Sequence, residues 1–429
     1  MIRGERRKTR RTALVVGTAI VVVTAIAIGV AVGVTGGNSP SPLVRASPVT
    51  LAPTQSQFPT SSPTVVPTAT PWTPVRTPLQ GIGGGGDAFG ASIDLRQDNI
   101  VAIGSPGFNN SIGMVQVFDI TGNQTVGQPL FGSTTNERFG TKVMLSRAAT
   151  ASPILAVLNN ATRISMYRIP QGSATWQATT APIDASVLLL AMNSTDPAAV
   201  VVVDCSMSGD GLTVAVALAS GRVVVLSFDA TVQRWTLVGH VLDVQSDRIS
   251  LSSNGRTLLV SSTTQLQILL YALERANSQQ GEEWRLLPSR ETAFDLPTNA
   301  MLSNLETSSG GAVLSERGDI FILADRQVGV MVVFSAANGF EWSIERTIMT
   351  PVHWFSLSGD TIVVAYIGDE SFVVVEALQL TSFGELIRLG GTIQIEVTIS
   401  TSDIWVSVAG NGNSIAVGVD NQVHFYSLV

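Results

Sequence analysis

The sequence predicts an all-β protein: a seven-bladed β-propeller, closed by an N-terminal strand and preceded by one transmembrane helix and a Pro/Ser/Thr stalk. Three observations lead to this prediction. A pattern of strands and turns recurs seven times after residue 87, four of the repeats add a segment that opens with tryptophan, and an uncharged apolar stretch lies near the N-terminus. They divide the chain into a basic tail (1–12), a transmembrane helix (13–34), a stalk (35–70) and a propeller (71–429).

The N-terminal segment predicts a membrane anchor. Residues 1–12 hold six Lys and Arg residues against one Glu, and residues 13–34 hold no charge. At about 1.5 Å per residue, a helix of this length crosses a hydrocarbon core of roughly 30 Å. Because basic residues beside a first span stay cytoplasmic, we expect a single-pass type II protein. Its N-terminus is then cytoplasmic, and its propeller is extracellular or lumenal. A cleaved signal peptide and an intracellular orientation are the alternatives.

The stalk, residues 35–70, is dominated by Pro, Ser and Thr. Proline favours extended geometry and removes hydrogen-bond donors, so this segment is expected to hold the body away from the bilayer, either O-glycosylated or as a bare spacer. Asn-x-Ser/Thr patterns fit a body outside the cytosol. They make four N-glycosylation candidates: Asn109, Asn123, Asn160 and Asn193.

The body is predicted to be a repeat of four-stranded units. Short runs rich in Val, Ile and Leu alternate with turns rich in Gly, Asn, Asp and Ser, which is typical of strands and hairpins. One repeat shows the pattern clearly: the turn at Ser208–Gly211 precedes the apolar run "LTVAVAL", and "RVVVLSF" follows a second turn. Repeat starts are about 43 to 67 residues apart. This spacing indicates propeller blades with loop insertions, and it leaves a count of six to eight open.

Tryptophan marks the expected fourth, outermost strand of four repeats, where it would cover the edge of the sheet. These residues are Trp176, Trp235, Trp284 and Trp342. The seventh repeat ends at Val429, directly after its third strand. "WTPVRTPLQG", which begins at Trp72, matches the missing strand, so we expect Trp72 to close the last blade from the front of the chain. A tryptophan stranded in a flexible stalk is the alternative.

The first two repeats resemble FG-GAP repeats of integrin-α-type propellers. The matching residues are Phe89-Gly90, "IVAIGSPG" at 100–107, "GMVQVF" at 113–118 and Phe139-Gly140. The middle repeats, with "LSSNGRTLLV" and "LSGDTIVV", resemble WD40-type blades. The resemblance implies a propeller over about residues 72–429. Calcium-binding FG-GAP loops follow the pattern Asp-x-Asp-x-Asp-Gly, but the loop "SPGFNNSIG" has no acidic residue, so no calcium site is carried over.

Few residues indicate chemistry, and we assign no catalytic, cofactor-binding or metal residue and expect no cofactor. The histidines lack metal-ligand spacing, and Cys205 lies in an apolar run, which predicts a buried, inert thiol. Aspartates near turns are expected to accept hydrogen bonds from turn amides. The residues concerned are His240, His353, His424, Asp204, Asp210, Asp319 and Asp360.

The net charge of −7 conceals a basic tail of +5, so the remaining chain carries −12. An acidic body argues against nucleic acid as a partner. The sequence therefore indicates a type II membrane protein that displays a propeller as a protein- or glycan-binding or adhesion module, rather than an enzyme. The long connections at 182–200 and 286–311 are the expected binding rim, unless they are tolerated insertions. The alternative function is a carbohydrate-active or other hydrolytic propeller with a carboxylate site on the central channel.

Overall fold

A computed structural model describes residues 71–428, with gaps at 84–85, 148–152, 180–181, 263–266, 276–280, 288–310, 326–328, 337–341, 350–351, 369–371, 383–384 and 398–403. The expected transmembrane helix and stalk lie outside the described residues, as does most of the connection at 286–311. Among the residues that the structure does describe, no helix is both long and apolar enough to span a bilayer.

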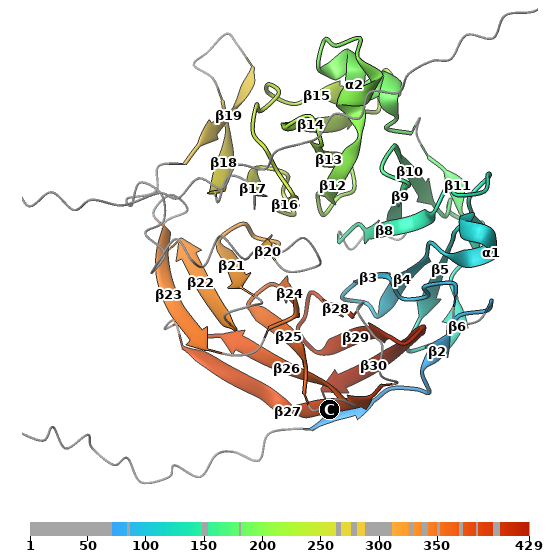
Figure 1. Ribbon diagram of the computed structural model, residues 1–429, viewed down its shortest axis with the longest axis vertical. Coiled ribbons are helices and arrows are strands. Elements are labelled where there is room, and N and C mark those ends of the chain that lie inside the picture. Colours follow the sequence, from blue (N-terminus) through green and yellow to red (C-terminus); the bar gives the residue numbers. More distant parts are fainter. Residues whose placement is uncertain are drawn as a thin grey trace, which may run out of the picture. The chain divides into compact units, whose positions relative to one another are not determined.

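The described strands form seven antiparallel sheets around a common centre (Figure 1). This confirms the all-β, seven-bladed propeller. The first blade holds β3 (Ser92–Leu95), β4 (Ile100–Ser105), β5 (Met114–Asp119), and a fourth strand split into β6 (Gln124–Thr125) and β7 (Leu130–Phe131). The second holds β8 (Phe139–Leu145), β9 (Ile154–Asn159), β10 (Arg163–Arg168) and β11 (Gln177–Ala178).

The next four blades repeat this order from the centre outward. The third holds β12 (Val202–Met207), β13 (Thr213–Leu218), β14 (Arg222–Asp229) and β15 (Arg234–Leu237). The fourth holds β16 (Arg248–Leu251), β17 (Thr257–Ser262), β18 (Gln267–Arg275) and β19 (Glu282–Leu286). The fifth holds β20 (Gly311–Leu314), β21 (Ile320–Asp325), β22 (Val330–Ala336) and β23 (Trp342–Met349). The sixth holds β24 (Trp354–Ser358), β25 (Thr361–Ile367), β26 (Phe372–Leu380) and β27 (Leu386–Glu396).

The seventh blade combines both ends of the described chain. It holds β28 (Trp405–Val408), β29 (Ser414–Val419) and β30 (Gln422–Leu428). Two short N-terminal strands, β1 (Trp72–Pro74) and β2 (Leu79–Gln80), pair antiparallel with β30. Trp72 lies opposite Leu428 in this register, and Leu79 lies opposite Val423. In Figure 1, β2 lies beside β30 although the two strands are far apart in the sequence.

Burial explains why the central strands of the blades are continuous apolar runs rather than alternating ones. A strand that has a neighbouring blade on each face is buried on both sides. In β13, for example, the five residues that follow Thr213 are all buried. The apolar core is accordingly divided into clusters that pack between neighbouring sheets.

The sequence did not predict the two short helices between β11 and β12. Helix α2 (Ala185–Ala191) begins after Asp184, whose side chain accepts hydrogen bonds from the backbone N–H groups of Ser186 and Val187. The short 3₁₀ segment η1 (Pro197–Val200) begins after Asp196 in a similar way. A further segment, α1 (Phe108–Ser111), is a left-handed turn rather than a helix, since Asn109 and Asn110 have positive φ. The caps at Asp184 and Asp196 are the local reason that α2 and η1 form in segments without strong helical periodicity.

Candidate functional site

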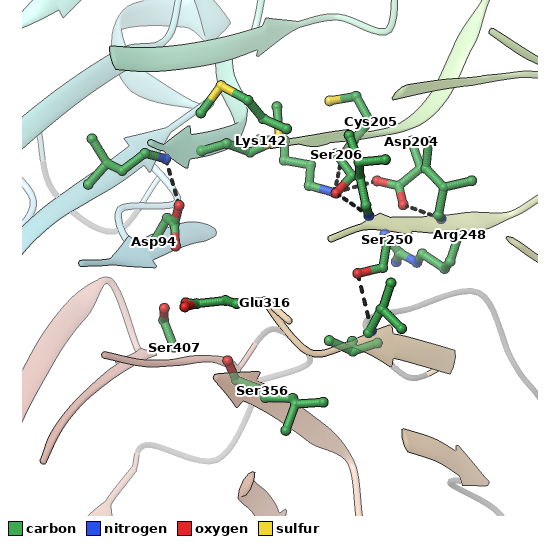
Figure 2. Close-up of a pocket in the computed structure, with 18 of the residues that line it drawn as sticks. Asp94, Lys142, Asp204, Cys205, Ser206, Arg248, Ser250, Glu316, Ser356 and Ser407 are labelled. Carbon is green, nitrogen blue, oxygen red and sulfur yellow. Dashed lines mark hydrogen bonds and ion pairs between the residues drawn. The ribbon is translucent and has the colours of Figure 1, made fainter. Parts of the chain in front are cut away.

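The inner strands of the blades enclose a central cavity of about 280 Å³. Its wall includes residues of β3, β8, β12, β16, β20, β24 and β28, one inner strand from each blade (Figure 2). Six charged side chains contribute to this wall: Asp94, Lys142, Arg147, Asp204, Arg248 and Glu316. The cavity is therefore polar and charge-balanced by residue type, in contrast to the acidic body as a whole.

A recurring hydrogen bond joins neighbouring inner strands around this cavity. A side-chain oxygen of one inner strand accepts the backbone N–H of the inner strand of the next blade. Four serines act in this way: Ser92 accepts from Val143 (2.8 Å), Ser206 from Leu251 (2.9 Å), Ser250 from Leu314 (3.1 Å) and Ser407 from Leu95 (2.9 Å). Because the cavity-facing edge of an inner strand has no partner strand, these side chains satisfy its otherwise unpaired donors.

Asp204 is saturated by structural partners. Its Oδ1 lies 2.6 Å from Lys142 Nζ, and its Oδ2 accepts the backbone N–H of Ile249 at 2.9 Å. Lys142 also donates to the carbonyl oxygen of Cys205 at 2.6 Å. The expectation that Asp204 satisfies a turn amide is wrong, because the residue lies within β12 and bonds to the next blade. Asp210 does occupy a turn, where its carboxylate accepts the N–H of Leu212 at 2.9 Å.

Arg147 also lines the cavity, and it links three blades. Its guanidinium donates to Asp94 Oδ1 and to the carbonyl oxygen of Leu95, both at 2.7 Å, and lies 3.5 Å from Glu316 Oε1. Asp94 Oδ2 accepts the N–H of Leu145 at 2.6 Å. Burial raises the pKa of Asp94 above its usual value, while Arg147 opposes that change. Glu316 also accepts the hydroxyl hydrogen of Ser358 at 2.7 Å.

These bonds bear on the hydrolytic alternative, which needs carboxylates available to a substrate. Both oxygens of Asp94 and of Asp204 are held by backbone donors and cations. Glu316 is bound by Ser358 and lies beside Arg147. The cavity carboxylates therefore act as links between blades, and their geometry gives the hydrolytic reading no support.

Cys205 and His424 both lie within strands of the propeller. Cys205 is fully buried in β12, as predicted, and burial raises the pKa of its thiol to about 12. His424 lies in β30, where burial lowers the pKa of its imidazole. Across the described residues, no group of three or more His, Cys, Asp or Glu side chains is arranged to hold a metal ion.

All four N-glycosylation candidates are exposed, and all four have positive φ. Asn is among the few non-glycine residues that tolerate this left-handed conformation, so each position has a conformational reason for Asn. Asn160 is the first central residue of a β9–β10 turn, in which Thr162 N–H donates to Asn159 O. Asn193 ends α2, where its N–H donates to Leu190 O and Ser194 N–H donates to Leu189 O. Together, these two hydrogen bonds at the end of α2 form the Schellman arrangement that ends many helices.

The two faces of the propeller differ in their exposed apolar side chains. We use "connection face" for the face formed by the blade-to-blade connections and by the loops between second and third strands. Twelve large apolar side chains are exposed in the described residues. Seven belong to segments on the connection face: Ile82, Phe131, Leu190, Val201, Val203, Ile367 and Phe372. Three belong to the opposite face: Leu212, Val232 and Ile387. The other two, Val75 and Leu286, lie on or directly beside outer strands.

Leu190 is the most exposed of these side chains, at 82 %. It lies on α2, within the connection that the sequence predicted as a binding rim. The apolar composition of α2 arises because the other side of the helix packs on the second and third blades, with Leu188 fully buried. Sequence reasoning missed the exposed apolar residues because a strand or helix pattern does not show which side chains a neighbouring blade covers.

Trp72 makes a contact that two other tryptophans also make. The indole Nε1 of Trp176 donates to Val126 O at 2.7 Å, and that of Trp284 donates to Val238 O at 3.0 Å. Trp72 Nε1 donates to Leu389 O at 2.8 Å. In each case the acceptor belongs to the preceding blade. The residue after the acceptor is a glycine with positive φ: Gly127, Gly239 or Gly390. We call this arrangement the tryptophan clamp.

The glycine of the clamp is required by space as well as by backbone conformation. A Cβ atom at Gly127 would lie 2.6 Å from Cδ1 of Trp176, and one at Gly239 would lie 2.7 Å from Cδ1 of Trp284. The indole therefore packs directly on the glycine backbone. Trp72 is itself 8 % exposed and belongs to the cluster between the sixth and seventh blades.

Comparison with known proteins identifies the fold. No family model matches the sequence, and no curated protein matches it. Among solved structures, a chain from the crystal structure of the Mitotic Checkpoint Complex is similar, with a TM-score of 0.52 and 12 % identity over 87 % of this chain and 99 % of that chain. The Cps50 (Swd1) β-propeller domain of Myceliophteria thermophila has a TM-score of 0.53 and 12 % identity, over 84 % of this chain and 100 % of that domain. The chain thus shares the β-propeller fold with these structures.

Proposed function

We propose that this protein is a binding module whose propeller recruits a protein partner through the connection face. The observation that carries the proposal is the concentration of exposed apolar side chains there. Exposed apolar patches mark interaction sites, since isolated soluble surfaces rarely keep them. The similar chain in the Mitotic Checkpoint Complex comes, by that title, from a protein assembly, which supports the same kind of role.

The α2 connection is the strongest part of this surface. Leu190 projects from a helix that is held at both ends, by the Asp184 cap and by the turn at Asn193. Val201 and Val203 are exposed at 43 % and 41 % beside the start of β12. A rigid support lowers the entropy cost of binding, because little has to be ordered when the partner docks. A protein partner with an apolar anchor suits this surface better than a glycan.

We further propose that residues 13–34 anchor the module in a membrane, with residues 35–70 as its stalk and an adhesive or display role outside the cytosol. The support is the length of the uncharged stretch, which suits a bilayer, and the basic tail that precedes it. The exposure of the four Asn-x-Ser/Thr sites is compatible with N-glycans. Their left-handed turns explain the same asparagines without modification, so a shift on glycosidase treatment is the informative measurement.

Proximity labelling from the full-length protein tests the binding face. We expect Leu190→Arg and Phe372→Arg to remove the specific set of labelled proteins, because a charge in an apolar contact must be desolvated. Val232→Arg on the opposite face is the matched control, since Val232 is also exposed, at 50 %. The proposed binding face is contradicted if the labelled proteins are lost only in the Val232→Arg control, or if they are retained in both connection-face variants.

A further inference from the structure

We propose that a second copy of this chain pairs with the outer edge of the sixth blade, through antiparallel contact between the β27 strands of the two copies. Strand β27 has 11 residues and is the outermost strand of its blade, so one of its edges has no partner strand (Figure 1). An exposed strand edge carries unpaired N–H and C=O groups and is a template for another strand. The inference does not depend on which protein the connection face binds.

Strand β27 differs from most outer strands of this propeller. The outermost strands of the first four blades have two to five residues. In the seventh blade, β1 has three residues and ends at Pro74. Only β23 of the fifth blade, with eight residues, comes near the length of β27. Short strands and prolines are two ways in which proteins protect a sheet edge, and β27 is long and contains no proline.

The backbone groups of alternate residues of β27 point away from its blade. A hydrogen bond from Thr381 N–H to Glu385 O closes the β26–β27 hairpin and fixes which residues of β27 bond to β26. The bulge after Leu389 inserts an even number of residues into β27, so the same alternation continues beyond it. Among the described residues, none hydrogen-bonds to the outward backbone groups of three exposed residues: Arg388, Gln394 and Glu396.

One antiparallel register makes β27 complementary to itself. When Thr392 lies on the twofold axis, opposite its own copy, Arg388 lies opposite Glu396 of the second copy. A twofold contact repeats this pair by symmetry. In the same register Leu389 lies opposite Ile395 of the second copy, so apolar side chains meet on the other face of the paired strands. Opposite charges and apolar side chains directly across a strand pair are stabilising, which favours this register over its neighbours.

This register does not require an uncompensated cation. Arg388 already forms an ion pair with Glu376 in its own blade, through Nη2. A guanidinium has five N–H donors in a planar fork, so other donors of Arg388 can bind a second carboxylate. Glu396 is exposed and has no ion-pair partner among the described residues. Pairing of the two copies therefore brings an unpaired carboxylate to a side chain that still has donors.

Thr392→Cys tests the register, because residue 392 meets its own copy on the twofold axis. Opposed Cα atoms of a hydrogen-bonded antiparallel pair are about 5.5 Å apart, a separation that a disulfide spans. The full-length protein is oxidised at low concentration, and disulfide-linked dimer is quantified by electrophoresis without reductant. Thr347→Cys, at an exposed position of β23, is the matched control. We expect about tenfold more dimer from Thr392→Cys than from Thr347→Cys, while the native Cys205 is buried and should not react.

Gln394→Pro, made in the Thr392→Cys protein, tests the backbone contact. Proline removes an outward N–H that β26 does not use, and edge strands tolerate proline at such positions. A docked strand loses this donor twice, so we expect about tenfold less cross-linked dimer. Gln394→Ala keeps the N–H and is the matched control, which should leave the amount of dimer unchanged.

Glu396→Arg, in the same background, tests the charge pair. It places like charges opposite each other at two symmetric positions, so the dimer should again fall about tenfold. Glu283→Arg, at an exposed position of the outer strand β19, makes the same change of net charge and should have no effect. Equal cross-linking of Thr392→Cys and Thr347→Cys would overturn the proposal, as would cross-linking that Glu396→Arg leaves unchanged. If Gln394→Pro fails to fold, the two cysteine variants and Glu396→Arg still decide the question.

Discussion

Replacing Trp72 tests how the ring of blades is held at its last blade. In the structure, β1 is only three residues long, yet it carries a side chain that is almost fully buried. Trp72→Ala removes the indole from the cluster between the sixth and seventh blades. It also removes the donor to Leu389 O. We therefore expect the substitution to destabilise the whole propeller rather than only its edge.

The size of the effect follows from these two losses. Truncating a buried tryptophan to alanine costs about 3–5 kcal/mol. The entropy of unfolding is about 2.1 cal/mol/K per residue, or ~0.75 kcal/mol/K for a domain of some 360 residues. The melting temperature should fall by about 4–7 °C. Trp72→Phe keeps most of the apolar surface but leaves Leu389 O without its donor, at about 1–3 kcal/mol, so its melting temperature should fall by about 1–4 °C.

Calorimetry of the full-length protein is the assay, with Trp284→Ala as the comparator. Trp284 makes the same clamp between two internal blades and is 2 % exposed. Shortened chains that begin at residue 71 and at residue 88 complete the series, and the second should melt lower or aggregate through its exposed edge. One outcome would refute this reasoning: Trp284→Ala lowers the melting temperature, but Trp72→Ala melts like the unsubstituted protein and the chain from residue 88 melts like the chain from residue 71. Trp72 would then belong to the stalk, and the domain would begin near Asp87.

Four further outcomes are expected. Gly239→Ala should cost about 2–4 kcal/mol by denaturant unfolding, since it adds a clash with Trp284 to an unfavourable φ, whereas Gly172→Ala, which has positive φ and open space, should cost only about 1–2 kcal/mol. Cys205 should resist iodoacetamide at pH 8 until the protein unfolds, because its thiol is buried and its pKa is about 12; rapid native labelling contradicts this. Calorimetric titration with calcium should be silent below millimolar concentrations, and a stoichiometric signal would refute that. Protease added outside intact cells should remove the propeller, and a body that stays protected while lumenal controls are digested contradicts the type II topology.

The sequence predicted the fold because propeller blades repeat local information. Each blade shows apolar strands and polar turns in the same order, so the period identifies the architecture even where individual strands are ambiguous. At Trp176 and Trp284 the structure gives a physical reason for a tryptophan at the outer strand: the indole packs on a glycine of the preceding blade. That glycine could be seen in the sequence, at Gly127 and Gly239, but its partner lies about one blade further along the chain.

The cavity could not be predicted in the same way, because its contacts join blades. Lys142 and Asp204 are 62 residues apart in the sequence, and Arg147 and Glu316 are farther apart still. Spacing within one repeat shows which inner-strand residues face the centre, but not which cation meets which carboxylate. The same limit applies to α2, whose Asp184 cap stabilises a helix in a segment where periodicity alone gave no signal.

The N-terminal strands lie against the last blade of a chain whose single cysteine allows no internal disulfide. β1 and β2 pair with the last strand, β30, and the chain then passes directly into the first blade. At this seam Phe89 N–H donates to Asn421 Oδ1 at 2.6 Å, and Leu95 N–H donates to Ser407 Oγ at 2.9 Å. On the other side of the seventh blade, Trp72 reaches the sixth. One N-terminal segment therefore contributes to the seventh blade, to its contact with the sixth and to its covalent connection with the first. Opening the ring here requires both the pairing with β30 and the contact with the sixth blade to be lost, so it should be cooperative with global unfolding.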